Sequence, residues 1–261
     1  MTIFPSIDNA RDLGGTRVAD GRKVRSRLLL RGGALAKASD RDLAVLRDEY
    51  NLAAIFDFRT SMEVQHSPDK QVDGAKYFWM PAFDEDSHSF REQNLPQEAY
   101  KHLGEWLVEH ASEERPQVFA KKLYADMVEN EFTQIQYAGF LQNIVHIDNG
   151  AVYWHCSQGK DRTGFGAAML LAALGADRDA IMEEYCLSAD FYKEELAMYI
   201  DKVNTQAEKT VIRTFLSVNP DYFAQALDLI DSEYGSMDKY LSGPLCLSED
   251  DITALKDRYL E

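Results

Sequence analysis

Short apolar runs and longer amphipathic stretches follow one another along the first half of the chain. Three apolar runs have the length of buried strands, and they cover residues 28–30, 52–56 and 77–80. Residues 39–50 are typical of a helix that begins with Ser39 and Asp42 at capping-box spacing. Residues 18–24 predict a hairpin. Strands that alternate with helices predict an α/β fold, with a central sheet flanked by helices.

The second half of the chain has mostly helical spacing of its apolar residues, over residues 97–147 and 177–218. In the first stretch, five aromatic residues are expected to lie in the core: Trp106, Phe119, Tyr124, Phe132 and Phe140. The second stretch carries four large residues on an amphipathic face: Phe191, Tyr192, Met198 and Tyr199. This face either packs against the rest of the protein or forms a helical lid over a site, and packing is the commoner arrangement.

Residues 155–164 carry most of the chemical information in the chain. They read HCSQGKDRTG and lie between two apolar runs, residues 151–154 and 165–171. This order predicts a strand, a tight loop and a helix. The first N–H groups of a helix have no partner within the helix, and the helix dipole adds positive potential at the same end. We therefore expect the loop to bind an anion, and phosphate in particular.

Cys156 and Arg162 give this loop the residues of a phosphate-transfer site. The loop amides, Arg162 and the helix N-terminus all favour the thiolate form of Cys156. Arg162 offers a planar fork of donors that suits two phosphoryl oxygens at once. We expect the thiolate to attack phosphorus, displace an alcohol or phenol and form a cysteinyl-phosphate that water then releases. The rest of the loop is expected to contact the substrate: Ser157, Gln158, Gly159, Lys160 and Thr163.

Several loop residues have more specific expected roles. Gly159 allows the loop to curl, because glycine reaches positive φ without a steric penalty. Thr163 is expected to donate its hydroxyl to the sulfur, and His155 to tune the thiol. This chemistry needs no metal and no cofactor. The other two cysteines, Cys186 and Cys246, are expected to be small buried residues. The same cradle without the chemistry would make a phosphate- or phosphopeptide-binding module, which is the alternative function.

The loop resembles the signature loop of cysteine-dependent protein tyrosine phosphatases, with His before the cysteine and Thr-Gly after the arginine. More narrowly, GKDRTG at 159–164 and NARDLGG at 9–15 are similar to the atypical bacterial tyrosine and phosphoinositide phosphatases. Weaker similarities lie at residues 55–59 with Glu63, at residues 234–241 and in a helix that begins at residues 248–251. The resemblance implies a phosphatase-like α/β fold and activity on phosphotyrosine, extending to phosphoserine or phosphothreonine and to phosphoinositides.

Protonation of the leaving oxygen requires an acid, and the chain offers two sets of candidates. In the resembled family, an acid directly before the loop arginine is thought to serve as proton donor, and Asp161 has this position. The other candidates are Asp84 and Asp86, in a polar stretch after a predicted strand, where a solvated acidic turn is the commoner interpretation. We favour Asp161.

Four charged residues outside the loop are candidates for supporting roles. Arg11 and Asp12 either brace the loop from below or only fix a turn. Asp57 ends a predicted strand, where ligand crevices of open α/β sheets lie, and is expected to hold Arg162 or Lys160 or to assist the acid. For Arg59 we prefer a plain ion pair with Glu63, four residues later.

Lys160 and the overall charge give opposite indications about the substrate. A second cation in the loop either meets a second phosphate, as on a phosphoinositide ring, or only keeps the loop soluble or supports the first phosphate. The chain has 28 basic and 44 acidic residues, which gives a formal net charge of −16. Such a chain is repelled by anionic membranes, so soluble phosphoproteins or small phosphate esters are the expected substrates, with no nucleic acid and no stable membrane association.

The remaining expectations concern the whole chain. Its 261 residues, of which 45% are hydrophobic, suffice for one phosphatase domain over residues 1–261. Three cysteines do not make a disulfide framework, and a reactive thiol suits a reducing compartment. The first residues lack a signal-peptide pattern, so we expect the cytoplasm, although the resembled family includes secreted effectors.

Overall fold

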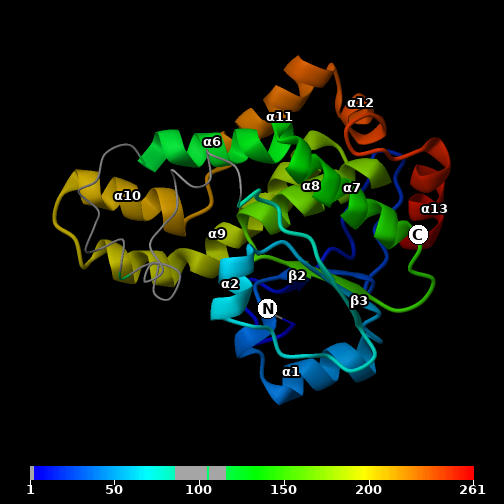
Figure 1. Ribbon diagram of the computed structural model, residues 1–261, viewed down its shortest axis with the longest axis horizontal. Helices are drawn as coiled ribbons and strands as arrows, with labels where there is room; N and C mark the ends of the chain where they lie inside the picture. Colours follow the sequence, from blue (N-terminus) through cyan, green and yellow to red (C-terminus); the bar gives the residue numbers. More distant parts are fainter. Residues whose placement is uncertain (1–2, 86–104, 106–115) are drawn as a thin grey trace.

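A computed structural model describes residues 3–85, 105 and 116–261, and it places a five-stranded mixed sheet at the centre of the protein (Figure 1). The strand order is β1-β2-β5-β3-β4. The strands are β1 Arg11–Asp12, β2 Leu29–Gly32, β3 Ala54–Asp57, β4 Lys76–Trp79 and β5 Val152–His155. Only β1 is antiparallel to its neighbour. The predicted α/β fold, with a central sheet flanked by helices, is confirmed.

The last strand in the sequence, β5, lies between β2 and β3, and its position sets the place of the site. His155, the final residue of β5, is in register with Gly32 at the end of β2 and with Asp57 at the end of β3. Parallel strands present their carboxyl ends at one edge of the sheet. The loop that follows His155 therefore begins at this edge, between two neighbouring strand ends.

The helices surround this sheet and follow the sequence order. They are α1 Asp40–Ala44, α2 Ser61–His66, α6 Pro116–Glu129, α7 Glu131–Val145, α8 Asp161–Leu174, α9 Arg178–Ile200, α10 Gln206–Leu216, α11 Pro220–Tyr234, α12 Met237–Ser242 and α13 Glu249–Tyr259. A 3-10 turn, Leu35–Lys37, precedes α1, and a π-helical turn, Val45–Glu49, follows it. No helix in the described part of the chain is long and apolar enough to cross a membrane.

Two hydrophobic cores lie on opposite faces of the sheet, because successive strand residues point to opposite sides. Phe56 and Trp154 belong to the larger core, which is covered by α6 to α8 and α11 to α13. Ile55 and Tyr153, their neighbours in sequence, belong to the smaller core beside α1. Figure 1 shows α7 and α8 on one side of the strands and α1 on the other. The expected core positions of Tyr124 and Phe140 are confirmed, and Phe132 is half-buried.

The predicted helical stretch 177–218 is two helices, α9 and α10, separated at residues 201–205. They run side by side as a projection from the main body (Figure 1), with a small core of their own that contains Val203, Val211, Ile212 and Leu216. In the stretch 97–147, Asn130 separates α6 from α7, while residues 97–104 and 106–115, with Trp106 and the side chain of Phe119, lie outside the described residues.

Three local predictions are changed by the structure. Ser39 caps α1 by accepting from the Asp42 amide, but the Asp42 carboxylate binds Ser6, so the reciprocal half of the capping box is missing. The 18–24 hairpin forms, with a single bridge between Arg17 and Lys23. The expectation for the two other cysteines was wrong, because Cys186 is half-buried and Cys246 is exposed. The prediction of a single domain over residues 1–261 stays a prediction.

Candidate active site

The predicted strand, loop and helix are β5, residues Cys156 to Lys160, and α8. Cys156 directly follows β5 and is only 3% exposed, and α8 begins at Asp161. Gly159 has a φ of +68°, and a Cβ added there would lie 2.2 Å from the carbonyl carbon of Gly32. Glycine is therefore required at this position both for the backbone conformation and for the close approach to β2.

The carbonyls of the loop point away from its centre. They accept from the Ala34 amide (to Ser157), the Tyr192 hydroxyl (to Gln158) and the side chains of Arg31 and Asn9 (to Gly159). A trans peptide carries its C=O and N–H on opposite sides, so the N–H groups of the following residues turn inward. These amides and the N-terminus of α8, which begins at Asp161, are the groups of an anion cradle of the kind that the sequence predicts.

Arg162 is held by Glu63, at the start of α2. The two carboxylate oxygens of Glu63 lie 2.6 and 2.7 Å from the terminal nitrogens of Arg162, and Ser157 Oγ donates to the same carboxylate at 2.5 Å. Burial alone would raise the pKa of Glu63, but the charge and hydrogen bonds of Arg162 and Ser157 lower it to about 2. Glu63 therefore stays ionised and fixes the orientation of the guanidinium.

This pairing corrects the expected ion pair between Arg59 and Glu63. Arg59 instead binds Asp57 and Asp69, at 2.7 and 2.8 Å. Arg59 precedes α2, so the spacing of four residues does not place its side chain on the same helical face as Glu63. The expectation that Asp57 holds Arg162 or Lys160 was also wrong, because its carboxylate is taken by Arg59 and by the Tyr77 hydroxyl, while the alternative that it assists the acid stays a prediction.

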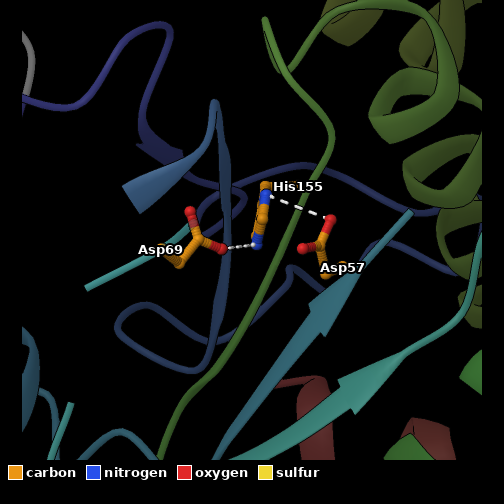
Figure 2. A group of neighbouring side chains, drawn as sticks. All are labelled: Asp57, Asp69 and His155. Carbon is orange, nitrogen blue, oxygen red and sulfur yellow. Dashed lines mark ion pairs between the residues drawn. The ribbon is translucent and has the colours of Figure 1, made fainter. Parts of the chain in front are cut away.

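His155 lies in this buried charged cluster, between Asp57 and Asp69 (Figure 2). Its Nε2 atom is 3.0 Å from Asp69 Oδ2, and its Nδ1 atom is 3.8 Å from Asp57 Oδ1 and 3.2 Å from the Cys156 carbonyl oxygen. Burial alone would lower the pKa of His155, but the charges of the two aspartates raise it. The two aspartates therefore favour the protonated form of the imidazole, which lies beside the Cys156 carbonyl oxygen.

Asp57, Asp69 and His155 lie close enough to be metal ligands, since one ligand atom from each falls within 4.8 Å of the others. The Arg59 guanidinium, however, already contacts both carboxylates. Its positive charge balances the cluster in the place that a cation would take. The residues therefore fit an ion-pair network better than a metal site.

Lys160 is buried, with 3% of its surface exposed, and its ammonium group donates to the backbone carbonyls of Phe215 and Ser217 at the end of α10. The nitrogen also lies 3.5 Å from Asp161 Oδ2. The position corresponds to neither a solvated loop lysine nor a free cation, because the ammonium group is held by backbone carbonyls, and the predicted contact with a second phosphate stays a prediction. Lys160 joins the loop to the α9–α10 pair.

The α9–α10 pair contacts the loop from outside. Tyr192 is buried and donates to the Gln158 carbonyl, and Tyr199 packs in the small core between the two helices. Phe191 and Met198 remain 36% and 48% exposed. The four residues of the predicted apolar face are therefore divided between packing and solvent. Whether this pair opens and closes as a lid stays a prediction.

Asp161 is the first residue of α8, and its Oδ1 atom accepts from the Tyr124 hydroxyl at 2.5 Å. The competing candidate Asp86 lies outside the described residues. Asp84 directly follows Phe83, whose ring centre is 5.2 Å from the Arg162 guanidinium carbon. Thr163 Oγ1 is buried and has no hydrogen-bond partner among the described residues, so the expected bond to the sulfur is not formed here.

Arg11 and Asp12 have different roles. Arg11 binds Glu184 at 2.7 Å and Asn9 Oδ1 at 2.6 Å, and Asn9 in turn donates to the Gly159 carbonyl, so Arg11 braces the loop through its neighbours. Asp12 accepts from the backbone amides of residues 14 and 27 and only fixes a turn.

Sequence reasoning missed four residues that hold the site: Asn9, Arg31, Asp69 and Glu184. Asn9 belongs to the NARDLGG stretch, which was a usable signal. Arg31 is fully buried in β2 and pairs with Glu184 at 2.6 Å, across 153 residues of sequence. No spacing rule joins residues that far apart, so the fold alone brings this pair together beneath the loop.

Comparison with known proteins agrees with this geometry. Residues 3–261 match the family model described as the tyrosine phosphatase family. A protein of Cupriavidus necator that is named as a candidate tyrosine-protein phosphatase is 31% identical over 98% of this chain and 87% of its own. The triple specificity protein phosphatase PtpB of Mycobacterium tuberculosis is 28% identical over 91% of each chain. The chain therefore belongs to the tyrosine phosphatase family.

Proposed function

We propose that the protein hydrolyses phosphoric monoesters through a cysteinyl-phosphate intermediate. The Cys156 thiolate attacks phosphorus, an S–P bond forms and the P–O bond to the leaving group breaks. Asp161 transfers its proton to the leaving oxygen. Water then attacks the same phosphorus, gives a proton back to Asp161 and releases phosphate and the thiolate. The loop amides, together with Arg162, stabilise the charge on the phosphoryl oxygens.

One observation supports this proposal: the carbonyls of Ser157, Gln158 and Gly159 are bonded outward, and the loop runs directly from Cys156 to the N-terminus of α8. An anion bound by this loop would lie beside the Cys156 nucleophile. Asp161 and Arg162, which follow the loop, supply a carboxyl group and a guanidinium. Ser157, Gln158, Gly159 and Lys160 supply the loop, and Thr163 has a free hydroxyl for the bound group or the sulfur.

The substrates that we propose are phosphotyrosine proteins and small phosphate esters. The name of the Mycobacterium relative includes triple specificity, and this supports a test of phosphoserine, phosphothreonine and phosphoinositides as well. The net charge of −16 favours soluble esters over a lipid surface. All three cysteines are free, which suits a reducing compartment such as the cytoplasm.

The test is a substrate profile with matched cysteine variants. Phosphotyrosine and phosphoserine peptides and a dispersed phosphoinositide are each incubated with the wild type, Cys156→Ser and Cys186→Ser. Release of phosphate from the phosphotyrosine peptide by the wild type and Cys186→Ser, but not by Cys156→Ser, is the expected result, with inhibition by vanadate. Tight binding of the peptide without any release would instead identify a phosphopeptide-binding module.

A further inference from the structure

Asp161 is the end of a chain of hydrogen bonds that starts in the protein interior. The backbone amide of Asn219, at the start of α11, donates to the Tyr185 hydroxyl at 3.1 Å. The hydroxyls of Tyr185 and Tyr124 lie 2.5 Å apart, and Tyr124 donates to Asp161 Oδ1, also at 2.5 Å. Four elements, α11, α9, α6 and α8, each contribute one member.

The direction of the protons along this chain is fixed by its two ends. A backbone N–H only donates, and each tyrosine hydroxyl has a single proton. Tyr185 therefore accepts from Asn219 and donates to Tyr124, and Tyr124 donates to Asp161. If Asp161 instead donated a proton from Oδ1 to Tyr124, both hydroxyls would have to turn round. The Tyr185 proton would then point at the Asn219 N–H, which has no lone pair to accept it.

Burial makes such a reversal costly. Tyr124 is 6% exposed and Tyr185 is fully buried, with its ring stacked on Phe223 at 4.0 Å between ring centres. A buried hydroxyl that loses its partner is unfavourable, because nothing replaces the hydrogen bonds that it made to water in the unfolded chain. Burial, with the nearby Asp161 charge, raises the pKa of both tyrosines, so both keep their protons at neutral pH.

We propose that Tyr124, supported by Tyr185, is a positioning residue that confines the catalytic proton of Asp161 to Oδ2. This inference rests on the proposed function, since it assumes that Asp161 protonates the leaving group. Oδ1 is permanently occupied as an acceptor, so the proton that leaves and returns in each cycle is carried on one defined oxygen. A fixed proton position is worth most where the leaving group is poor.

The connection between α10 and α11 holds both neighbours of this carboxyl group. Asn219 orients the tyrosines that bind Oδ1, while the carbonyls of Phe215 and Ser217 hold Lys160, whose nitrogen is 3.5 Å from Oδ2. Each oxygen of Asp161 therefore has a neighbour anchored to residues 215–219. The orientation of the Asp161 carboxyl group therefore depends on the position of residues 215–219.

The experiment compares a good and a poor leaving group. The value of kcat/KM is measured for p-nitrophenyl phosphate and for phenyl phosphate with the wild type, Asp161→Asn, Tyr124→Phe, Tyr185→Phe and the double variant Asp161→Asn/Tyr124→Phe. The control is Tyr240→Phe, which removes another buried hydroxyl that donates to the Val128 carbonyl in the same helix as Tyr124. Asp84→Asn tests the competing acid.

Because general acid catalysis is typically worth ~10²- to 10⁴-fold, we expect Tyr124→Phe to lose about tenfold with phenyl phosphate and clearly less with p-nitrophenyl phosphate. Tyr185→Phe also lowers kcat/KM more for phenyl phosphate than for p-nitrophenyl phosphate. Tyr240→Phe leaves the ratio of the two kcat/KM values unchanged. In the absence of the Asp161 acid, the Tyr124 substitution adds no further loss, since the two residues act as one unit.

Equal losses on both substrates in Tyr124→Phe, or a full additional loss in the double variant, would overturn the positioning role. The positioning role is also overturned if Asp84→Asn, and not Asp161→Asn, loses more activity with phenyl phosphate than with p-nitrophenyl phosphate. In that case the acid would be Asp84. These outcomes leave the cysteine mechanism intact. Retained turnover in Cys156→Ser, or none in the wild type, would instead refute the proposed function and the positioning role with it.

Discussion

Glu63 binds both terminal nitrogens of Arg162 and the hydroxyl of Ser157, so one carboxylate from α2 fixes a residue of the loop after β5 and a residue in the first turn of α8. A guanidinium has five N–H donors, and this pair uses two of them. A further donor reaches the Phe58 carbonyl oxygen at 3.4 Å, and the others are available to phosphoryl oxygens in the proposed reaction. The arginine is therefore oriented before any substrate arrives, which lowers the cost of organising the site during the reaction.

Replacing Glu63 should disturb both stability and activity. In Glu63→Gln, Arg162 loses its charged partner, and we expect the free energy of unfolding to fall by roughly 3 kcal/mol, as for other broken buried ion pairs. We also expect kcat/KM for p-nitrophenyl phosphate to fall, because the guanidinium is no longer held in one orientation. Urea denaturation and steady-state kinetics measure the two effects. Glu233→Gln, at an exposed position, is the control, and a Glu63 variant that behaves like it would contradict this role.

Lys160 should hold α10 against the loop. In Lys160→Met, the hydrogen bonds to Phe215 and Ser217 are lost, and we expect the amides of α10 to exchange with solvent at least about tenfold faster, given ~1.5 kcal/mol or more for each bond to a charged group. Hydrogen exchange with mass spectrometry compares α10 with α13 as the internal reference. Lys193→Met, at an exposed position on α9, is the matched control. Unchanged exchange in α10 would show that the lysine does not anchor it.

The buried carboxylates Asp57 and Glu63 should make the fold sensitive to acid. Burial raises the pKa of each carboxylate, but their ion pairs and hydrogen bonds outweigh it. Each pKa falls to about 2, from ordinary values of 3.8 and 4.5. Their contribution to stability is complete above the ordinary values and is lost as the pH falls toward the folded values. We expect the unfolding free energy to drop between about pH 5 and about pH 2. Asp57→Asn should make this drop smaller, as measured by urea denaturation, and an unchanged drop would contradict the assignment.

His155 should titrate above its ordinary pKa of 6.5, because the charges of Asp57 and Asp69 outweigh the effect of burial. Its contribution to stability is complete below 6.5 and is lost as the pH rises through the folded value. In Asp69→Asn we expect a lower pKa for His155, measured by NMR of the labelled imidazole. Asp73→Asn removes an exposed carboxylate from the same segment and should leave it unchanged. Equal pKa values in both variants would rule out the Asp69 contact as the cause.

The fold class and the centre of the site could be predicted because both depend on local sequence. Strand β5, the loop and α8 are contiguous, and the order of apolar run, glycine-containing loop and helix is visible over twenty residues. The sheet order could not be predicted in this way. Strand β5 comes last in the chain yet lies between β2 and β3, and only packing on both faces sets that position.

The partners of charged residues were predicted least well. Arg59 and Glu63 have helical spacing, but Arg59 lies before the first turn of α2 and points to the cluster of Asp57 and Asp69 instead. Tyr124 was predicted as a core residue, and it is buried, but its hydroxyl also reaches Asp161. A hydrophobic pattern shows which face of a helix is buried, and it contains no information about the polar atom at the end of a side chain.

The most direct test of the central claim is hydrolysis of p-nitrophenyl phosphate across a range of pH with EDTA present. The wild type, Cys156→Ser and Cys186→Ser are compared at equal concentration. The account predicts turnover by the wild type and by Cys186→Ser, and none by Cys156→Ser, because only Cys156 lies at the anion cradle. Turnover by Cys156→Ser, or its absence in the wild type, would contradict a thiolate phosphatase.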